Sequence, residues 1–520
     1  MNKMLSHTRP RGVADRIADP GERNQTPNGL LQTSPRCEVD RTVAVVTLAM
    51  LTLVGAGLRF WGANACLWID EINCLRKAIR PPMSEIVTTF HGDIQHPLYC
   101  VLARVSIVGL GESPWALRLP AILFGIAVIP LVYGVARIAL TRGESLFVAG
   151  LMAVSYHPVW FSQNARGYTA LLFWTLLGTY WLYQGVVQRR GACLFGFAVA
   201  AALGAYTHLS MAIVVAGQGL AVFIYLATAG RHQWRTAWRP VVLSLGASGL
   251  LTVLIYSPML PAMIQFFGTP SKMQGTSTPS WAMFEAMRAF QFGFQGLLGA
   301  FFLVGLAAGV IVVGWGTWSL ARRDPLFCLL CTVPVVFTAI GIVLARGTLY
   351  PRYVFFGMGF GLILGVHGLF ACGGWIGPRW FIRSADSTRC STIGPVALAG
   401  LLLLLTALTL PRNYQSPKQD FAGAVRFFET EVDARDPVAT LGAARWAFLD
   451  YFGLPWALLE SPEQLQRMLQ DPRPLWVVYT FERYIPASLR ESIHANMDLY
   501  RKLPGTLRQG EVYIFREKPR

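Results

Sequence analysis

Residues 41–71 read RTVAVVTLAMLTLVGAGLRFWGANACLWIDE. The first twenty of these residues are almost all apolar, so as a helix they can cross about 30 Å of hydrocarbon. Two adjacent carboxylates, Asp70 and Glu71, follow soon after the apolar run ends. A charge this close to the membrane interface requires a partner. The stretch therefore predicts a membrane helix followed by a loop with a functional role.

Similar apolar runs recur as far as residue 411. Hydrophobic residues make up 53% of the 520 residues and charged residues only 14%, whereas soluble domains average about 25% charged residues. This composition excludes a soluble globular protein, and the continuous apolar runs exclude a membrane barrel, whose strands would alternate. The net charge of +17 is expected from arginines in cytoplasmic loops. We expect no nucleic-acid partner.

The sequence predicts an all-α polytopic membrane protein with about eleven spanning helices. They are expected near 42–61, 115–137, 145–162, 168–187, 192–208, 210–229, 240–262, 296–319, 325–345, 353–372 and 393–411. Alternate turns are basic and carry Arg137 and Arg142, Arg189 and Arg190, Arg231, Arg235 and Arg239, Arg322 and Arg323, and Arg379, Arg383 and Arg389. Basic turns stay in the cytoplasm. We therefore predict a cell inner membrane protein with a cytoplasmic N-terminus and a periplasmic C-terminal region.

Three regions follow from this threading. Residues 1–41 lack apolar periodicity and are expected to form a disordered cytoplasmic tail. Residues 42–411 form the transmembrane domain, whose first outer loop, 62–114, contains a short apolar run that is too polar to cross and should form a partly embedded helix. Residues 412–520 hold 14 of the 28 acidic residues. Their helix-like stretches 419–434 and 485–501 and strand-like stretches 475–480 and 512–516 predict a small α/β domain.

The outer loop 62–114 holds five of the nine acids found between residues 42 and 411. Besides Asp70 and Glu71, it contains His91, Asp93 and His96 within six residues. We interpret these three side chains as positioning substrate hydroxyls or a phosphate. Two alternatives stay open: a metal site, although the spacing matches no familiar metal motif, and a polar helix cap before a proline.

Arginines in other outer loops are informative because this side of the membrane disfavours them. Arg166, Arg346 and Arg352 could bind an anionic head group, since a guanidinium fork suits phosphate oxygens. The alternative is a snorkelling interfacial arginine. His208, at the outer end of its span, is either a polar helix terminus or a site residue. The long loop 265–295, with Lys272, Trp281 and Arg288, is expected to close over the site, the alternative being a passive connector.

Five motifs occur in order along the membrane part. They are Trp68-x-Asp70-Glu71, Asp93-x-x-His96-Pro97-Leu98, Ala116-Leu117-Arg118-Leu119-Pro120, Ser162-Gln163-x-Ala165-Arg166 and Pro351-Arg352-Tyr353. This combination resembles a GT-C glycosyltransferase of the dolichyl-phosphate-mannose protein mannosyltransferase type over about residues 40–370. The segment Pro417-Lys418-Gln419-Asp420-Phe421 is similar to the start of the tail domain in bacterial members.

The resemblance implies an enzyme that transfers a hexosyl or pentosyl group from a polyprenyl-phosphate donor on the outer face, with inversion. The acceptor would be a lipid, a glycan or a protein. By the same resemblance Asp70 matches the catalytic aspartate that activates the acceptor and Glu71 matches its neighbour, and we expect both to be catalytic residues. Arg352 matches a donor-phosphate residue, to which we add Arg166 and Arg346. The expected substrate-binding residues are His91, Asp93, His96, His208 and Tyr353.

The chain departs from many relatives at two positions. They have two prolines after the position of His96, and they have an acid where this chain has Asn164. We expect no cofactor, with a divalent metal left as an open alternative. The rival hypothesis is a polytopic transporter or lipid flippase. Such proteins place ionisable residues near the midplane, often in inverted halves, and neither feature is found in the sequence.

Overall fold

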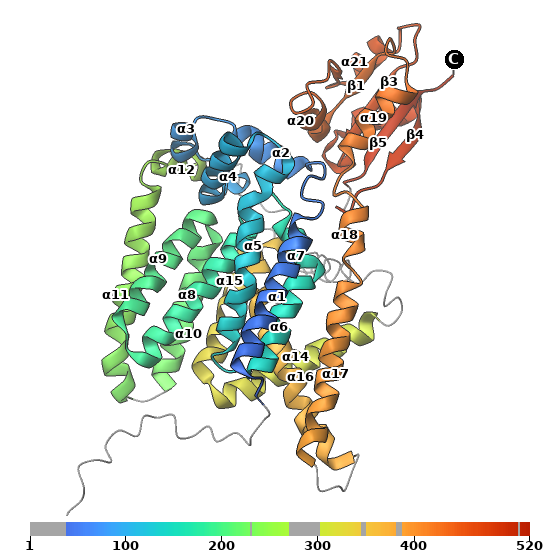
Figure 1. Ribbon diagram of the computed structural model, residues 1–520. Coiled ribbons are helices and arrows are strands. Elements are labelled where there is room, and N and C mark those ends of the chain that lie inside the picture. Colours follow the sequence, from blue (N-terminus) through green and yellow to red (C-terminus); the bar gives the residue numbers. More distant parts are fainter. Residues whose placement is uncertain are drawn as a thin grey trace, which may run out of the picture. The chain divides into compact units, whose positions relative to one another are not determined.

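The computed structural model describes residues 38–228, 231–269, 302–344, 350–380, 387–507 and 510–519 (Figure 1). From Asp40 to Arg520 the chain packs as one unit. The helices of the membrane part are α1 (Arg41–Phe60), α5 (Pro114–Ala136), α6 (Arg142–Val154), α7 (Tyr156–Ser162), α8 (Tyr168–Gln188), α9 (Gly191–Thr207), α10 (Ser210–Thr228), α11 (Arg231–Tyr256), α12 (Leu260–Phe267), α14 (Phe302–Arg323), α15 (Pro325–Leu344), α16 (Met358–Trp380), α17 (Ser387–Ala407) and α18 (Pro411–Gln415).

Within the described residues, nine helices are long and apolar enough to cross a membrane. They coincide with nine of the predicted spans, so the polytopic helical fold is confirmed. The other two predicted spans are shorter in the structure. The span 192–208 is the apolar helix α9, which has 17 residues, and the span 145–162 is divided between α6 and α7.

The division between α6 and α7 has a local cause. Pro158 cannot donate a backbone N–H, and its ring would clash with the carbonyl of Val154, four residues earlier. Helix α6 therefore ends at Val154, and Ser155 is extended with φ −75° and ψ 147°. Two carbonyls in the last turn of α6 accept hydrogen bonds of 2.9–3.0 Å from the buried guanidinium of Arg59 on α1. Arg59 thereby supplies hydrogen-bond donors to carbonyls at the point where the helix is interrupted.

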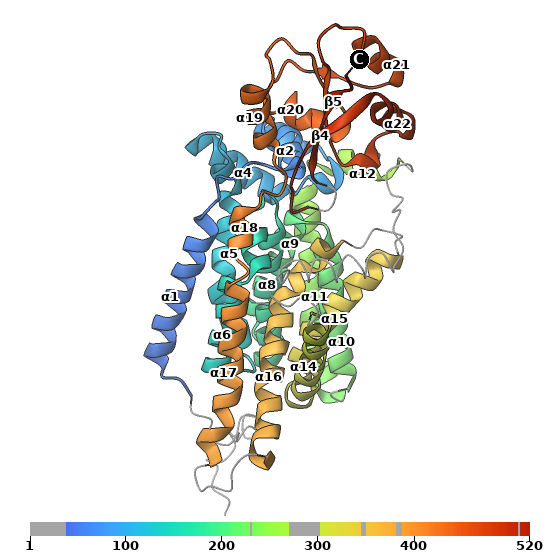
Figure 2. The ribbon, with the colours of Figure 1, turned by 90° about the vertical axis from the view of Figure 1, so that its right-hand side faces the viewer.

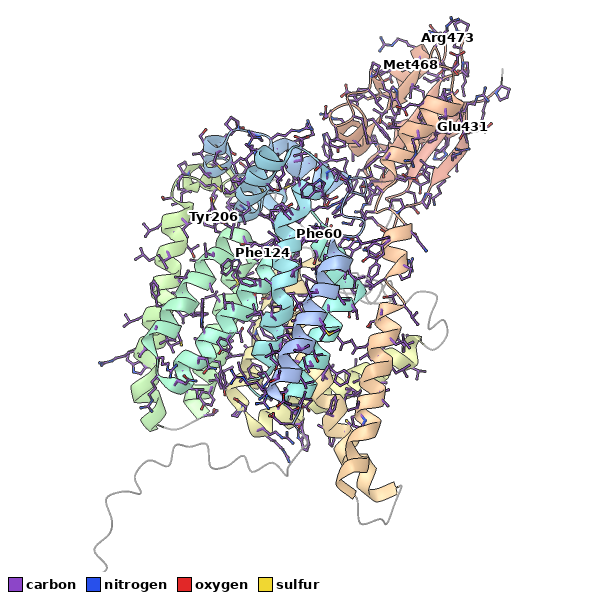
Figure 3. All side chains as sticks on the ribbon, in the orientation of Figure 1. Phe60, Phe124, Tyr206, Glu431, Met468 and Arg473 are labelled. Carbon is purple, nitrogen blue, oxygen red and sulfur yellow. The ribbon has the colours of Figure 1, made fainter. Side chains whose placement is uncertain are left out.

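Large apolar side chains face outward along the bundle. Helix α1 buries only Ala44, Gly55 and Arg59, while Phe60 at its end is 44% exposed (Figure 3). Apolar surface of this extent is unusual on a soluble monomer, whereas in a bilayer it faces lipid tails. The pattern supports the assignment of these helices to the membrane.

The outer loop folds into short helices: α2 (Ile69–Cys74), the π-helical turn η3 (Leu75–Ile79), α3 (Met83–Thr88), the 3₁₀ turn η4 (Gly92–Ile94) and α4 (Pro97–Leu110). Figures 1 and 2 show α2 and α4 together at one end of the bundle. The predicted short helix in this loop is confirmed as α4, which has 14 residues. It begins with Pro97, whose missing N–H costs nothing at a helix start, and ends at Gly111, where φ is +84°.

The C-terminal region contains a five-stranded sheet with the order β2-β1-β3-β5-β4. Strands β2, β1 and β3 are parallel, and β5 runs antiparallel between β3 and β4. Its elements are α19 (Phe421–Glu431), β1 (Val438–Thr440), η8 (Gly442–Ala444), α20 (Arg445–Phe448), β2 (Ala457–Leu458), α21 (Pro462–Met468), β3 (Trp476–Thr480), η9 (Glu482–Tyr484), α22 (Ala487–Asn496), β4 (Met497–Leu503) and β5 (Val512–Glu517).

One expectation for this region is wrong. The stretch 485–501 was expected to be helical throughout, but α22 ends at Asn496 and the chain continues directly as strand β4. Pairing with β5 along Met497–Leu503 decides the conformation there. Such pairing depends on a distant partner rather than on local propensity.

The C-terminal sheet packs on the outer loop through one hydrophobic cluster. Ile69 and Ile72 of α2 bury their side chains together with Phe421, Phe448 and Trp476 of the C-terminal region. Burial of one such side chain stabilises by about 1.5–3 kcal/mol. The two segments are therefore mutually stabilised, although more than 300 residues separate them in sequence.

Candidate active site

The two neighbouring carboxylates of α2 point in different directions. Successive residues of an α-helix are rotated by about 100°, so Asp70 and Glu71 cannot occupy the same face. Glu71 is fully buried and caps the helix by accepting the backbone N–H of Trp68 at 3.2 Å. The side chain of Asp70 is 31% exposed. Helix α2 thus directs the carboxylate of Glu71 to the protein interior and leaves that of Asp70 partly exposed.

Glu71 forms a buried ion pair with Arg118 of α5. The guanidinium donates to both carboxylate oxygens, at 2.6 and 2.8 Å, and the backbone N–H of Ala165 donates at 2.7 Å. Arg118 also donates to the carbonyls of Ala63 and Ala65. Burial opposes the ionised carboxylate, but the charge of Arg118 outweighs it and holds the pKa of Glu71 below its ordinary value. Each oxygen of this carboxylate already has protein partners.

Asp70 and Arg352 form a looser and more open pair. Arg352 follows Pro351 in the 3₁₀ helix η7 (Pro351–Gly357), and its Nη1 lies 3.5 Å from Oδ2 of Asp70. The two side chains are 27% and 31% exposed. The guanidinium lies over the ring of Tyr350 at 4.4 Å and near that of Tyr353 at 5.5 Å. The structure therefore brings together three of the predicted site residues, Asp70, Arg352 and Tyr353.

A cavity of about 630 Å³ opens beside Asp70 and Arg352. Asp70 is the one carboxylate among the described residues that line it. Aromatic rings supply much of the wall: Trp68, Trp160, Phe161, Tyr168, Tyr350, Trp446, Phe481 and Tyr484. A large, mainly apolar cavity with a few convergent polar groups is the usual form of a ligand site.

Two imidazoles lie together next to this cavity. The ring of His96 is 4.7 Å from that of His208 and 5.2 Å from that of Tyr168. Nδ1 of His96 accepts the N–H of Gly167 at 3.3 Å, so Nε2 carries the proton of the neutral ring. Burial, followed by the charge of Arg166, lowers the pKa of His96 well below its ordinary value and that of His208 to about 3. Both rings are neutral at pH 7.

Nε2 of His96 is buried and has no hydrogen-bond partner among the described residues. Arg166 is buried nearby, with its guanidinium 5.9 Å from the ring of Tyr168. Burial opposes its charge, but Tyr168 and Asp70 hold the pKa of Arg166 above its ordinary value. Of the predicted residues, His96, His208 and Arg166 thus lie around Tyr168 on the cavity wall, although none of the three is among the residues that line the described cavity.

Other predicted site residues are not brought to the cavity. The backbone N–H of His91 donates to Oε1 of Gln95 at 2.9 Å, and the adjacent Gly92 lies against Phe266 of α12. His91 is not among the residues that line the described cavity. Three predictions lie outside the described residues: the side chain of Asp93, the whole of Arg346, and the closing loop from residue 270 onward.

The C-terminal region is hydrogen-bonded to the start of α2. Oε1 of the buried Gln419 accepts the backbone N–H of Ile69 at 2.9 Å. Nε2 of Gln419 donates to Oγ1 of Thr480, at the end of β3, at 3.0 Å. One side chain thereby links the residue before Asp70 to the C-terminal sheet.

Lys418 makes a second link from the C-terminal region. Its ammonium donates to the carbonyl of Gln163 and lies 4.7 Å from the ring centre of Trp160 on the cavity wall. Burial lowers the pKa of Lys418 to about 7, although the negative charge of Glu71 opposes this shift. The lysine therefore links the C-terminal region to the loop between α7 and α8.

Sequence reasoning named Arg118, Lys418 and Gln419 only as parts of motifs and assigned them no role. One signal could have identified Arg118, because a charge inside an apolar span needs a buried partner. No sequence pattern predicts that residues between 442 and 484 line the cavity. Their position there depends on how the C-terminal sheet packs on α2.

The contacts also test the predicted threading. Trp68 donates to Asn164 at 2.7 Å, His96 contacts His208, and Asp70 contacts Arg352. Every one of these residues was predicted on the same side of the membrane. Apolar spanning helices, a cavity lined by Asp70 and Arg352, and a small α/β unit beside it together define a polytopic membrane protein with a candidate active site.

Comparison with known proteins gives a family match over part of the chain and similar folds over most of it. Residues 96–261 match the family described as dolichyl-phosphate-mannose-protein mannosyltransferase. The fold is similar to that of ArnT from Cupriavidus metallidurans bound to undecaprenyl phosphate, with a TM-score of 0.55 and 15% identity over 92% of this chain and 100% of that chain. The apo state of that protein gives 0.55 and 13% over 92% and 99% of the two chains. AglB from Archaeoglobus fulgidus gives 0.49 and 11% over 88% and 72%.

No curated protein sequence matches the chain significantly. The chain has the GT-C fold, and the resemblance of its membrane part to the dolichyl-phosphate-mannose protein mannosyltransferases is confirmed by the match over residues 96–261.

Proposed function

We propose that this protein transfers a sugar from a polyprenyl-phosphate donor to an acceptor on the periplasmic face of the inner membrane, with inversion. The observation that carries the proposal is the Asp70–Arg352 pair, 3.5 Å apart on the wall of a 630 Å³ cavity. A carboxylate that can take a proton and a guanidinium that can hold a phosphate are the two groups that such a transfer requires.

The donor phosphate fits the group formed by Arg352, Arg166, His96 and His208. A guanidinium binds phosphate oxygens through two parallel hydrogen bonds. The neutral His96 offers one more donor, its buried Nε2–H. Among the similar structures, ArnT from Cupriavidus metallidurans is described as bound to undecaprenyl phosphate, which supports this donor class. Negative charge on the phosphate grows as the C–O bond breaks, so these groups stabilise the transition state more than the ground state.

Asp70 is proposed as the general base. It takes the proton of an acceptor hydroxyl while the oxygen forms its bond to the anomeric carbon of the sugar. The bond between that carbon and the phosphate oxygen breaks, and the polyprenyl phosphate leaves with the electron pair. Attack from the face opposite the phosphate inverts the anomeric centre. The sugar can be a hexose or a pentose in this scheme.

Glu71 is proposed as a positioning residue rather than a second base. Its side chain is fully buried, and its oxygens are held by Arg118, Trp68 and Ala165. Proton transfer requires the base to be within hydrogen-bond reach of the acceptor. Glu71 does not line the described cavity, so it acts on the reaction by fixing α2 and with it Asp70.

The described residues do not fit a divalent metal site. They contain no group of three or more His, Cys, Asp or Glu side chains that could hold an ion. Asn164, at the position where many relatives have an acid, has its Oδ1 occupied by the indole N–H of Trp68 at 2.7 Å.

The direct test is transfer by purified protein from a panel of polyprenyl-phosphate sugars, with release of polyprenyl phosphate as the readout. We expect one sugar to be used by the wild type, and Asp70→Asn to be nearly inactive. Glu85→Gln is the matched control, because Glu85 is an exposed acid of the same loop. In cells that lack the protein, the same lipid-linked sugar should accumulate. No release from any donor would refute the proposal.

The proposed orientation has its own test. Reporter fusions after residues 143 and 190 should report the cytoplasm, and a fusion after residue 411 should report the periplasm. A cytoplasmic signal at 411 would put the Asp70 cavity on the wrong face for this reaction.

A further inference from the structure

One edge of the C-terminal sheet faces the cavity. Strands β1 and β3 are parallel neighbours, so their carboxyl ends lie side by side. From β1 the chain goes to β2 on one side of the pair, and from β3 it goes on to β4 and β5 on the other side. In open α/β sheets this reversal leaves a crevice at the carboxyl ends, where ligands bind.

The loops that leave these two strands both reach the cavity. Gly442 and Trp446 follow β1, and Phe481, Arg483 and Tyr484 follow β3, and all five line the cavity that contains Asp70. The φ angles of Gly442 and Phe481 are +60° and +54°. A phenylalanine in the left-handed region is strained, and such strain is concentrated at binding and active sites. The unusual backbone turns the segment 481–484 toward the cavity.

The exposed side chains of this edge that line the cavity are aromatic or basic, whereas the acid Glu482 between them does not line it and pairs with Arg490 and His494. Tyr484 is 61% exposed, and the guanidinium of Arg483 lies over its ring at 4.7 Å and donates to its hydroxyl at 2.8 Å. Arg483 has no ion-pair partner among the described residues, and no acid of the C-terminal region is among the residues that line the cavity. The donor phosphate in the proposed reaction is held by Arg352, so Arg483 remains for another anion.

We propose that this edge binds the acceptor, and that the acceptor head group is a sugar that bears a phosphate or a carboxylate. The proposal rests on the proposed transferase function and adds the class of the acceptor. The sugar lies against the rings of Trp446 and Tyr484, its acidic group pairs with Arg483, and its free hydroxyl faces Asp70. The C-terminal region then selects the acceptor, while the membrane helices bind the donor.

The test uses the purified full-length protein in lipid nanodiscs and three probes: glucose 6-phosphate, glucuronate and glucose. We expect at least one of the two anionic probes to bind about tenfold more tightly than glucose, the scale of one charge-assisted hydrogen bond. Arg483→Gln should remove this preference, and Trp446→Ala should weaken binding of all three probes. The relative affinities of the two anionic probes separate a phosphate from a carboxylate. The control Arg467→Gln changes an exposed arginine on α21 away from the cavity and should bind as the wild type does.

Equal binding of the three probes to the wild type, or a preference that survives Arg483→Gln, would overturn the inference. Binding of undecaprenyl phosphate is measured in the same samples and should be unchanged in Arg483→Gln. If the lipid does not bind to any sample, the proposed transferase function fails, whatever the sugar probes do.

A second inference rests on a different observation, the two buried thiols of the outer loop. Cys74 on α2 and Cys100 on α4 are both inaccessible, and their sulfurs lie 3.9 Å apart. Cys74 lies one helical turn after Asp70, and the backbone N–H of Cys100 donates to the carbonyl of His96 at 2.8 Å. A bond between the two sulfurs would therefore fix the spacing of two site residues.

We infer that Cys74 and Cys100 form a disulfide in the mature protein, because the proposed function places this loop in an oxidising compartment. The two thiols lose two protons and two electrons to an incoming protein disulfide, which leaves as a dithiol. The exchange occurs during folding, before the two side chains are buried.

The test is mass spectrometry of protein purified without reductant, alkylated under denaturing conditions and then digested. We expect a linked pair of peptides that contain Cys74 and Cys100, while Cys66 in the same loop is alkylated as the internal control. Alkylation of both Cys74 and Cys100 in unreduced protein would overturn the inference. The result does not depend on any transferase activity.

Discussion

Two arginine–carboxylate pairs start from neighbouring positions of the same short helix, yet they differ in nearly every physical respect. Glu71 and Arg118 are 2.6 Å apart with side chains 0% and 2% exposed. Asp70 and Arg352 are 3.5 Å apart and about one-third exposed. The buried pair is saturated by its own partners and by backbone groups, whereas the open pair retains free hydrogen-bonding capacity. The tight, buried pair holds the structure of the site in place, whereas the loose, open pair has groups that remain available for chemistry.

The largest expected effect is on turnover at the open pair. Asp70→Asn keeps the shape of the side chain and removes the proton acceptor, so transfer should fall by about 10²–10⁴-fold, the usual worth of general base catalysis. Binding of polyprenyl phosphate and the thermal stability should stay close to wild type. Transfer kinetics and lipid binding in detergent would measure the two separately. Near-normal turnover would refute the assignment of Asp70 as the base and move the search to another acid of the outer loop, such as Asp93.

The next effect is on stability at the buried pair. Glu71→Gln leaves the charge of Arg118 buried without its counter-ion, which should destabilise the protein by about 3–5 kcal/mol. Because pairing holds the pKa of Glu71 below its ordinary value of 4.5, the stabilisation is complete above that pH and is lost as the pH falls further. Thermal unfolding between pH 3 and 7 would measure both effects.

A matched double variant sharpens this second prediction. Glu71→Leu combined with Arg118→Met removes both charges, and it should recover much of the stability lost in Glu71→Gln. A double variant as unstable as the single one would show that shape, rather than charge, decides the fold at α2.

The third effect separates binding from chemistry at Arg352. Arg352→Ala should weaken binding of polyprenyl phosphate and also slow transfer, because a phosphate contact is present in the ground state and tightens in the transition state. Arg352→Lys should rescue only part of both, since a point charge replaces a two-pronged donor. Full rescue by lysine would mean that phosphate binding depends on the positive charge alone and not on the two-pronged geometry of the guanidinium. Arg80→Lys, at an exposed ion pair with Glu112, provides a control.

A smaller effect is expected where the C-terminal region holds α2. Gln419→Ala removes the hydrogen bonds to Ile69 and Thr480, and leaving such buried groups unpaired costs about 1–3 kcal/mol. Since the N–H of Ile69 precedes Asp70, transfer should slow more than lipid binding weakens. Comparison of melting temperature and turnover with Gln464→Ala, a half-buried glutamine of α21, would isolate the effect of position.

The last prediction concerns the pH dependence of stability at Lys418. Its pKa is lowered to about 7 by burial, so between pH 7 and its ordinary value of 10.5 the unfolded chain binds more protons than the folded one. Stability should therefore rise with pH across this window. In Lys418→Met the rise should disappear, which melting curves from pH 6.5 to 9.5 would measure. A wild type that loses stability over this range would contradict the assigned shift.

The membrane part could be predicted from the sequence because one signal, the length of an uninterrupted apolar run, depends only on residues that are close together in the chain. The apolar run from Ala44 to Phe60 identifies α1 without knowledge of the helices that pack against it. The alternating basic turns then give the expected orientation of the remaining spans. The break at Ser155 was missed, although Pro158 could have indicated it. Strand β4 could not be distinguished from a helix, because its conformation depends on β5.

The sequence alone could predict a site residue only where the residue type is unusual in its local surroundings. Asp70 and Arg352 stood out because charges are rare in their surroundings. The division of labour between Asp70 and Glu71 was not visible in sequence, since it depends on which face of α2 meets Arg118 of α5. The aromatic wall from the C-terminal sheet depends on a docking that brings Gln419 to Ile69 across 350 positions.

That separation of 350 positions has a consequence for biogenesis. At a synthesis rate of about 5–20 residues per second, the ribosome needs roughly 20–70 s to pass from Ile69 to Gln419. During this interval the first outer loop is made while the partner that caps and covers α2 does not yet exist. The loop that carries α2 must wait in an incomplete state, open to quality-control proteases, until the end of the chain arrives. A nascent chain that stalls in its last hundred residues would keep the membrane helices and still lack an ordered candidate site.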